Sequence, residues 1–69
     1  MSSASMRVAL RYLTGAEGKA IRIALIRHDK TGTDVAAAVG LGESSFSRVI
    51  HGHRRVSEAM ISAIWKAIA

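Results

Sequence analysis

The sequence predicts an all-α fold, a compact bundle of four to five short helices in a single domain. Apolar residues recur at helical spacing through most of the 69 residues. Residues that cap helices precede several of these runs, and proline is absent. A chain of this length with one tryptophan, one tyrosine and one phenylalanine can fill only one small core. We therefore treat residues 1–69 as one domain, in which residues 1–5 are expected to be flexible.

The segment 6–13 is compatible with two kinds of structure. A helix would begin after Ser5, which would cap it. Its inward face would hold Met6, Ala9, Leu10 and Leu13. A strand would instead alternate, and its apolar face would hold Val8, Leu10 and Tyr12. The sequence leaves both alternatives open.

A long helix is expected to begin near Gly15. Thr14 and Glu17 have the spacing of a capping box, in which each side chain accepts a hydrogen bond from the backbone N–H of the other. The inward face of this helix consists of Ala20, Ile21, Ala24, Leu25 and His28. We therefore expect His28 to be a semi-buried packing residue.

Two further isoleucines of this helix, Ile23 and Ile26, fall on its opposite face. The charged residues of that face are Lys19, Arg22 and Arg27. A surface helix needs only one apolar face, so another part of the protein should cover Ile23 and Ile26. The candidates are the segment 6–13 and a second subunit, and we favour the N-terminal segment.

Two short helices are expected next, separated only by the sequence GLG. The first begins at Thr31, in the capping-box pattern TGTD, and ends at Gly40. The second opens after Gly42 and ends near Gly52. It carries Glu43 in its first turn, where a carboxylate complements the helix dipole.

The short connection requires these two helices to cross steeply, so that their backbones approach each other. Ala36 is small enough for the point of contact, and Gly40 can adopt the left-handed turn. An apolar cluster is expected under the corner, formed by Val35, Val39, Leu41, Phe46 and Val49. These residues have a structural role in the prediction.

The last helix is expected to begin after Ser57 as its cap and to face the core. Its apolar stripe consists of Met60, Ile61, Ile64, Trp65 and Ile68. Ser62 and Lys66 fall on the opposite face.

The stretch TGTDVAAAVGLGESSFSRVIHGHRR resembles the helix-turn-helix of the phage Cro and lambda-repressor type, the XRE-like family. The resemblance covers the chain from about Gly18 onward, and seven positions agree in type and spacing. Three positions depart from the family pattern. Gly32 stands where a glutamine often contacts phosphate, Gly42 replaces a Ser or Thr cap, and Ser57 replaces a proline. None of these departures breaks the fold.

The resemblance implies a sequence-specific regulator of transcription that binds double-stranded DNA, with the helix from Glu43 to Ile50 in the major groove. A phage or prophage repressor of the Cro kind that binds an operator as a homodimer is the expected function. The charge supports DNA binding independently, because the chain has a formal charge of +5 and a pI near 10.9. No acidic residue occurs between Ser44 and Ser57. A solvated basic loop without a ligand is the alternative.

Four side chains of the third helix are expected to contact bases: Glu43, Ser44, Ser47 and Arg48. For Glu43 and Ser44 this role follows from matching positions in the family. Arg48 can donate two hydrogen bonds to guanine, and a phosphate contact is its alternative role. Glu43 can accept from cytosine N4 or serve only as a partner of the helix dipole.

Six residues are expected to contact the DNA backbone: Thr31, Thr33, His51, His53, Arg54 and Arg55. The last three fall in the loop after Gly52, where they would bind phosphates without reading sequence. The two threonines begin the preceding helix, and capping is their alternative role.

Other classes of function are disfavoured. The absence of cysteine excludes a disulfide framework, a thiol nucleophile and a cysteine-based zinc site. His51 and His53 lack further ligands nearby, so we expect no metal site. Ser47 and His51 lack an orienting acid, so we expect no enzyme activity, no cofactor and no small-molecule ligand. No run approaches the roughly 18 apolar residues of a membrane span, and we expect a cytoplasmic, nucleoid-associated protein without a membrane partner.

Two other functions stay open, a regulator similar to lysogeny activators and a protein-binding, antitoxin-like helix-turn-helix module. An apolar exposed face on the third helix would favour a protein partner. The residues of that face are Ser44, Ser47, Arg48 and His51, which favour DNA.

Overall fold

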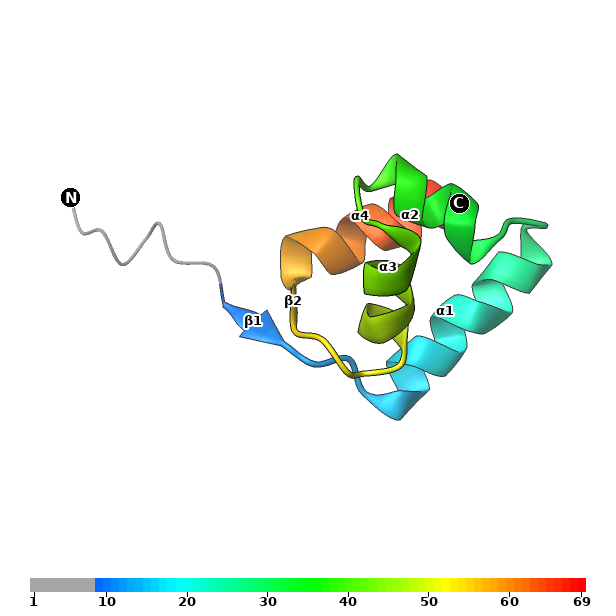
Figure 1. Cartoon of the computed structure of the whole chain (residues 1–69). Helices are drawn as coiled ribbons and strands as arrows, with labels where there is room; N and C mark the ends of the chain where they lie inside the picture. Colours follow the sequence, from blue (N-terminus) through cyan, green and yellow to red (C-terminus); the bar gives the residue numbers. More distant parts are fainter. Residues whose placement is uncertain (1–8) are drawn as a thin grey trace.

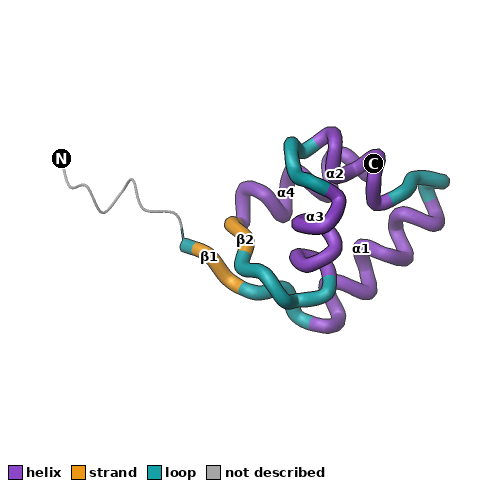
Figure 2. The backbone as a smooth tube through the Cα atoms, in the orientation of Figure 1, coloured by secondary structure: helices purple, strands orange, loops and turns teal. Residues whose placement is uncertain are grey.

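The computed structural model describes residues 9–69 and contains four helices and two short strands (Figure 1). The elements are β1 (Leu10–Arg11), α1 (Gly15–Arg27), α2 (Gly32–Ala38), α3 (Glu43–Ile50), β2 (Val56–Ser57) and α4 (Glu58–Ile68). Helices make up most of the backbone, and the strands form one small corner of it (Figure 2). The prediction of a small all-α bundle is therefore confirmed.

The described part of the N-terminal segment contains the two-residue strand β1 and no helix. β1 pairs antiparallel with β2, and Leu10 lies opposite Ser57 while Arg11 lies opposite Val56. Leu13 turns into the core, whereas Leu10 and Tyr12 are exposed. The helical alternative is therefore wrong for residues 10–13. Its cap Ser5, and the positions of Met6 and Val8, lie outside the described residues.

Hydrogen bonds from the Arg11 side chain connect this strand to two helices. Its guanidinium donates two hydrogen bonds of 2.7 Å to the Glu17 carboxylate, one to each oxygen, and its Nε–H donates to Glu58. Arg11 therefore connects β1 to the first turn of α1 and the first turn of α4. These bonds also hold the pKa of Glu17 at about 2 and raise that of Arg11.

Side chains cap three of the four helices, as the sequence predicts. Thr14 and Glu17 form a complete capping box on α1, and Thr31 and Asp34 form another on α2. Hydrogen bonds from the backbone and side chain of Thr31 also lower the pKa of Asp34. The Ser57 hydroxyl accepts from the backbone N–H of Met60, at 3.1 Å, in the first turn of α4. On α3 the cap is Gly42, which offers no side-chain hydrogen bond.

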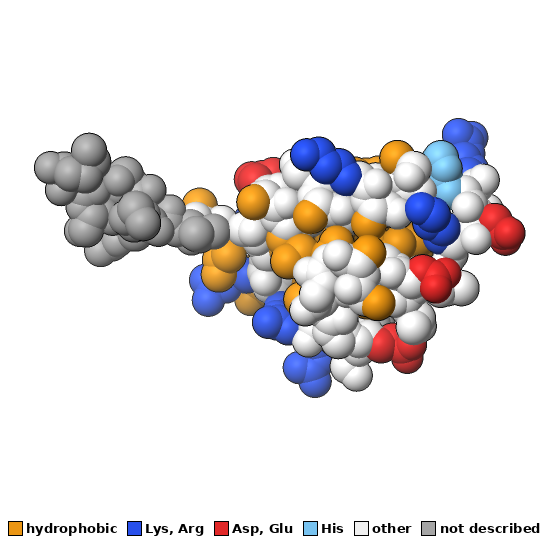
Figure 3. Space-filling view, turned by 90° about the horizontal axis from the view of Figure 1, so that it is seen from above, with side chains coloured by type: hydrophobic (Ala, Val, Ile, Leu, Met, Phe, Trp, Pro, Cys, Tyr) orange, Lys and Arg blue, Asp and Glu red, His pale blue; other side chains and the backbone are white. Residues whose placement is uncertain are grey.

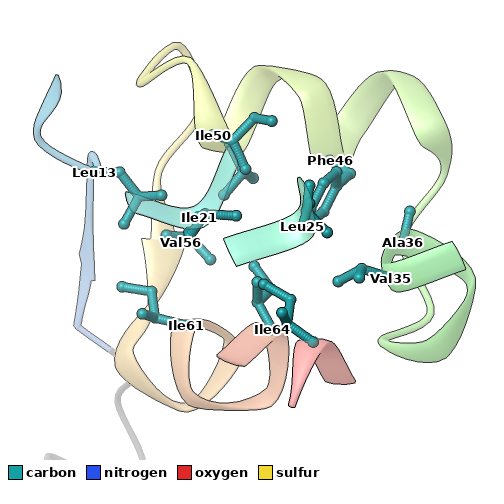
Figure 4. Packing of buried hydrophobic residues seen from close by; sticks show 12 residues of the cluster. Leu13, Ile21, Leu25, Val35, Ala36, Phe46, Ile50, Val56, Ile61 and Ile64 are labelled. Atoms are coloured by element: carbon teal, nitrogen blue, oxygen red, sulfur yellow. The ribbon is translucent and has the colours of Figure 1, made fainter. Parts of the chain in front are cut away.

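The core lies between the four helices and draws on each of them (Figure 4). Its largest fully buried side chains are Phe46, Ile21, Ile64, Ile68, Val35 and Val49. Val39, Leu41, Met60 and Ala67 are half-buried and pack against it. On the face seen from above, hydrophobic side chains gather in the centre and charged ones lie around them (Figure 3).

Two predictions about α1 are wrong. His28 is exposed rather than semi-buried, because the helix ends at Arg27 and His28 is its C-cap. Ile23 and Ile26 are 44% and 81% exposed, so the described part of the N-terminal segment does not cover them. β1 instead lies beside β2, at the opposite side of the molecule from the end of α1 (Figure 1).

The corner between α2 and α3 has the predicted construction. Ala36 is buried, and Gly40 has a φ of +76°, in the left-handed region. The N–H of Leu41 donates to the Ala36 carbonyl and that of Gly40 to the Ala37 carbonyl, which closes a Schellman motif at the end of α2. Under this corner, Val35, Phe46 and Val49 are buried, and Val39 and Leu41 are half-buried.

Candidate nucleic-acid interface

α3 divides its residues sharply between the core and the surface. Its buried residues are Phe46, Val49 and Ile50. Its exposed residues are Glu43, Ser44, Ser47 and Arg48, and His51 is exposed directly after it. The buried residues fix the rotation of the helix, so the polar residues must face outward together.

The four residues predicted to contact bases line one open, polar depression, formed by Glu43, Ser44, Ser47 and Arg48. Its walls combine carboxylate, hydroxyl and guanidinium groups, which are the donors and acceptors that base edges require. Chemical groups for reading bases are thus collected on one face of α3.

Glu43 has a partner within the protein. The Thr33 hydroxyl donates a hydrogen bond to the Glu43 carboxylate, which connects the first turn of α2 to the first turn of α3. This contact supplies the side-chain anchoring that Gly42 cannot give. Thr31 is a cap, which was its alternative role, and Thr33 is exposed but does not cap α2. A base contact by Glu43 would have to compete with Thr33.

The basic residues predicted to contact phosphates lie in the loop directly after α3. Its exposed side chains are His51, His53, Arg54 and Arg55. Gly52 takes a φ of +75° and turns the chain. The N–H of His53 donates to the Arg48 carbonyl at 2.8 Å, so the loop is held against the last turn of α3. The loop and the depression on α3 are therefore adjacent parts of one surface.

The arginines of this surface form no ion pair with any described residue, and Glu43 is the one acidic side chain among its residues. Both ion pairs found in residues 9–69 involve Arg11, with Glu17 and Glu58 as its partners. Arg48, Arg54 and Arg55 have no carboxylate partner in that part of the chain. Free guanidinium groups of this kind are available to a polyanion.

The position of α3 depends on a glycine that the sequence reasoning missed. Gly18 is buried in α1, and a Cβ built on it would lie 2.0 Å from the backbone oxygen of Ile50. Only glycine permits α1 and the end of α3 to approach so closely. A glycine in the middle of a predicted helix was a usable indication of close packing, but the sequence does not identify the partner.

No group of three or more His, Asp or Glu side chains that could hold a metal ion occurs within residues 9–69. The rings of His51 and His53 lie 6.5 Å apart, measured between centroids. No helix among residues 9–69 is long and apolar enough to cross a membrane.

Comparisons with protein families, curated proteins and solved structures found no match.

Proposed function

We propose that the protein is a sequence-specific regulator of transcription that binds double-stranded DNA through α3. The observation that carries this proposal is the polar depression on α3 beside a basic loop that has no acidic partner. A short helix held by a Schellman turn on a second short helix is a geometry that can enter the major groove. The resemblance to phage Cro and lambda-repressor proteins supports the same function.

The proposed contacts divide into two kinds. Arg48 reads a base through two hydrogen bonds, with Ser44 and Ser47 beside it. Arg54 and Arg55 bind phosphates and set the register of α3 in the groove, with His51 and His53 adding donors. Thr31 and Thr33 begin α2 and are proposed to donate to a phosphate, for which Thr33 would have to give up its hydrogen bond to Glu43.

We also propose that two copies bind one operator in the bacterial cytoplasm. One recognition helix reads only a few base pairs, and a dimer doubles the contacts over two half-sites about one helical turn apart. Ile26 on α1 is the most exposed large apolar side chain among residues 9–69, and Ile23 lies one turn before it on the same side of the helix, so a partner at α1 would cover both.

A protein-binding module is less well supported by α3. Its outward residues are a glutamate, two serines and an arginine, which leave no apolar anchor on this face.

Selection from random duplexes tests the proposed function. The protein should enrich one sequence with two related half-sites, and sequencing should give their spacing. Affinity for the selected duplex should fall steeply with salt, because Arg48, Arg54 and Arg55 displace counterions. A flat salt response, or enrichment of no sequence, would refute DNA recognition by this protein.

A further inference from the structure

A second depression, apart from the polar one on α3, lies where α3, β1, β2 and α4 meet. It has a volume of about 200 Å³. Its apolar lining consists of Leu10, Leu41, Val49, Val56 and Met60. Arg54 and Arg55 also line it. The proposed DNA contacts use these two arginines but leave the apolar lining without a role.

The size and chemistry of this depression fit one apolar side chain. A cavity of roughly 150 Å³ lined by apolar residues holds a benzene molecule, so the space is sufficient for a leucine or phenylalanine side chain. Leu10 is 52% exposed, and Leu41 and Met60 are half-buried, so an occupant would find apolar surface to cover.

The two arginines that line the depression favour negative charge beside the inserted apolar side chain. Arg54 and Arg55 are exposed and have no carboxylate partner among residues 9–69. Glu58, at the start of α4, is bound by Arg11. An acidic segment would therefore find two free guanidinium groups beside an apolar depression.

We propose that this depression binds an acidic segment of a partner protein, which inserts one leucine or phenylalanine between β1 and α4. Its carboxylates pair with Arg54 and Arg55. As a consequence that rests on the proposed function, the partner and the operator compete for the same two arginines, and binding of the partner releases DNA.

Other occupants fit less well. DNA phosphates satisfy the arginines but cover none of the apolar lining. A second copy of this chain lacks a suitable acidic segment, because four of its five carboxylates are already engaged. Asp29 remains, and it follows the last turn of α1.

A synthetic peptide, Glu-Asp-Glu-Leu-Asp-Glu-Asp with blocked ends, is a suitable probe. One control peptide replaces its leucine by alanine, and a second replaces its acidic residues by amides. The expected affinity is about tenfold higher for the leucine peptide than for the alanine peptide, since a buried leucine contributes more apolar contact. Amide chemical shifts measured without DNA should change around Leu10, Met60 and Arg55. Equal affinity for the leucine and alanine peptides, or chemical-shift changes centred on α1, would refute binding of the peptide in this depression.

Matched variants test the apolar wall. Leu10→Ser should weaken the leucine peptide about fivefold, whereas Tyr12→Ser should not, because Tyr12 is similarly exposed but does not line the depression. Neither variant should alter duplex affinity. An equal loss of peptide affinity in both variants would overturn the proposal in favour of a general surface effect. If Leu10→Ser alone changes the sedimentation of the protein without peptide, the depression is a contact between copies instead, and the proposal is overturned.

The competition is measured with the selected duplex and the unmodified protein. The leucine peptide should displace the duplex, and the amide peptide should not. Arg48→Ala should weaken the duplex while leaving peptide affinity unchanged. Failure of duplex binding with intact peptide binding would refute the proposed function only, whereas simultaneous binding of both ligands would refute the competition only.

Discussion

At the scale of single residues, arginines with the same chemistry have different tasks that depend on where the backbone places them. Arg11 is bound by two carboxylates and holds β1 in place. Arg48 stands on α3 beside Ser44 and Ser47, and Arg55 stands in the loop that follows. The sequence identified Arg48 and Arg55 as candidates from their positions on the third helix and in the loop after Gly52, and the absence of acids between Ser44 and Ser57 supported them. It could not identify Arg11, because Glu58 lies 47 residues away along the chain.

Arg48 and Arg55 should differ in their effect on specificity. Arg48→Ala should lower specific binding by about 1–3 kcal/mol per half-site and relax the preference at one base pair. Arg55→Ala should weaken binding to all sequences alike, because it removes a phosphate contact. Titrations of both variants with the selected duplex and with each single-base substitution of it measure these effects. Equal loss of discrimination in the two variants would contradict the assigned roles.

Gly18→Ala should destabilise the fold. The new Cβ would lie 2.0 Å from the Ile50 carbonyl oxygen, so α1 and α3 would have to separate. Overpacking of this kind costs about 1–3 kcal/mol, a large share of the stability of a small domain. Gly15→Ala is the matched control, because nothing lies within 4 Å of a Cβ built at Gly15. Thermal unfolding of the two variants should show a lower midpoint for Gly18→Ala only.

At the scale of secondary-structure elements, the local features were predictable and the long-range ones were not. Both capping boxes, the Ser57 cap and the left-handed Gly40 depend on residues within a few positions, and the structure contains all of them. The pairing of β1 with β2 joins residues more than 40 positions apart, so alternation in the segment 6–13 left helix and strand open. For α1, the periodicity placed His28 inward, but the helix ends before it.

The polar face of α3 was predictable for a similar reason. Phe46 and Val49 fix which side is buried, and Ser44, Ser47 and Arg48 must then lie outward. The hydrogen bond between Thr33 and Glu43 was not predictable, because the sequence predicts that α2 and α3 cross but not which side chains of their first turns meet.

The first turn of α1 should make the stability of the protein dependent on acid. The pKa of Glu17 in the folded protein is about 2, below its usual value of 4.5, because Arg11 and the Thr14 backbone donate hydrogen bonds to the ionised form. Because the pKa of Glu17 is lower in the folded protein than in the unfolded chain, the ionised carboxylate stabilises the fold above about pH 4.5. This stabilisation is lost as the pH falls toward 2. The lowered pKa of Asp34 acts in the same direction.

Urea unfolding at several pH values measures this dependence. The midpoint should fall between pH 4.5 and 2 in the unmodified protein. Glu17→Gln should be less stable at neutral pH and should lose less on acidification, and Arg11→Gln should behave alike because it removes the partner. An unchanged acid dependence in both variants would show that the Arg11–Glu17 pair does not cause it.

At the scale of the whole molecule, the basic surface of α3 and the exposed isoleucines of α1 belong to different faces. The residues of α1 that pack inward are Gly18, Ile21 and Leu25. Ile23 and Ile26 fall on its other side, at the spacings that place them next to Lys19, Arg22 and Arg27. A surface that is apolar at its centre and positively charged around it is proposed above to pair with a second copy.

Dimerisation through α1 should respond to salt in the opposite direction from DNA binding. Pairing two copies buries Ile23 and Ile26 but brings like charges together, and salt screens that repulsion within about 10 Å at 0.1 M. Sedimentation equilibrium without DNA should therefore show a tighter dimer at higher salt, while each half-site contact with DNA weakens.

Ile26→Asp should give a monomer, because it places a charge where the most exposed large apolar side chain stands at 81% exposure. Tyr12→Asp is the matched control and should leave the dimer intact, since Tyr12 is exposed beside β1. Loss of the dimer in Tyr12→Asp alone would move the interface to β1, and a protein that stays monomeric at every salt concentration and protects one half-site on DNA would exclude a dimer.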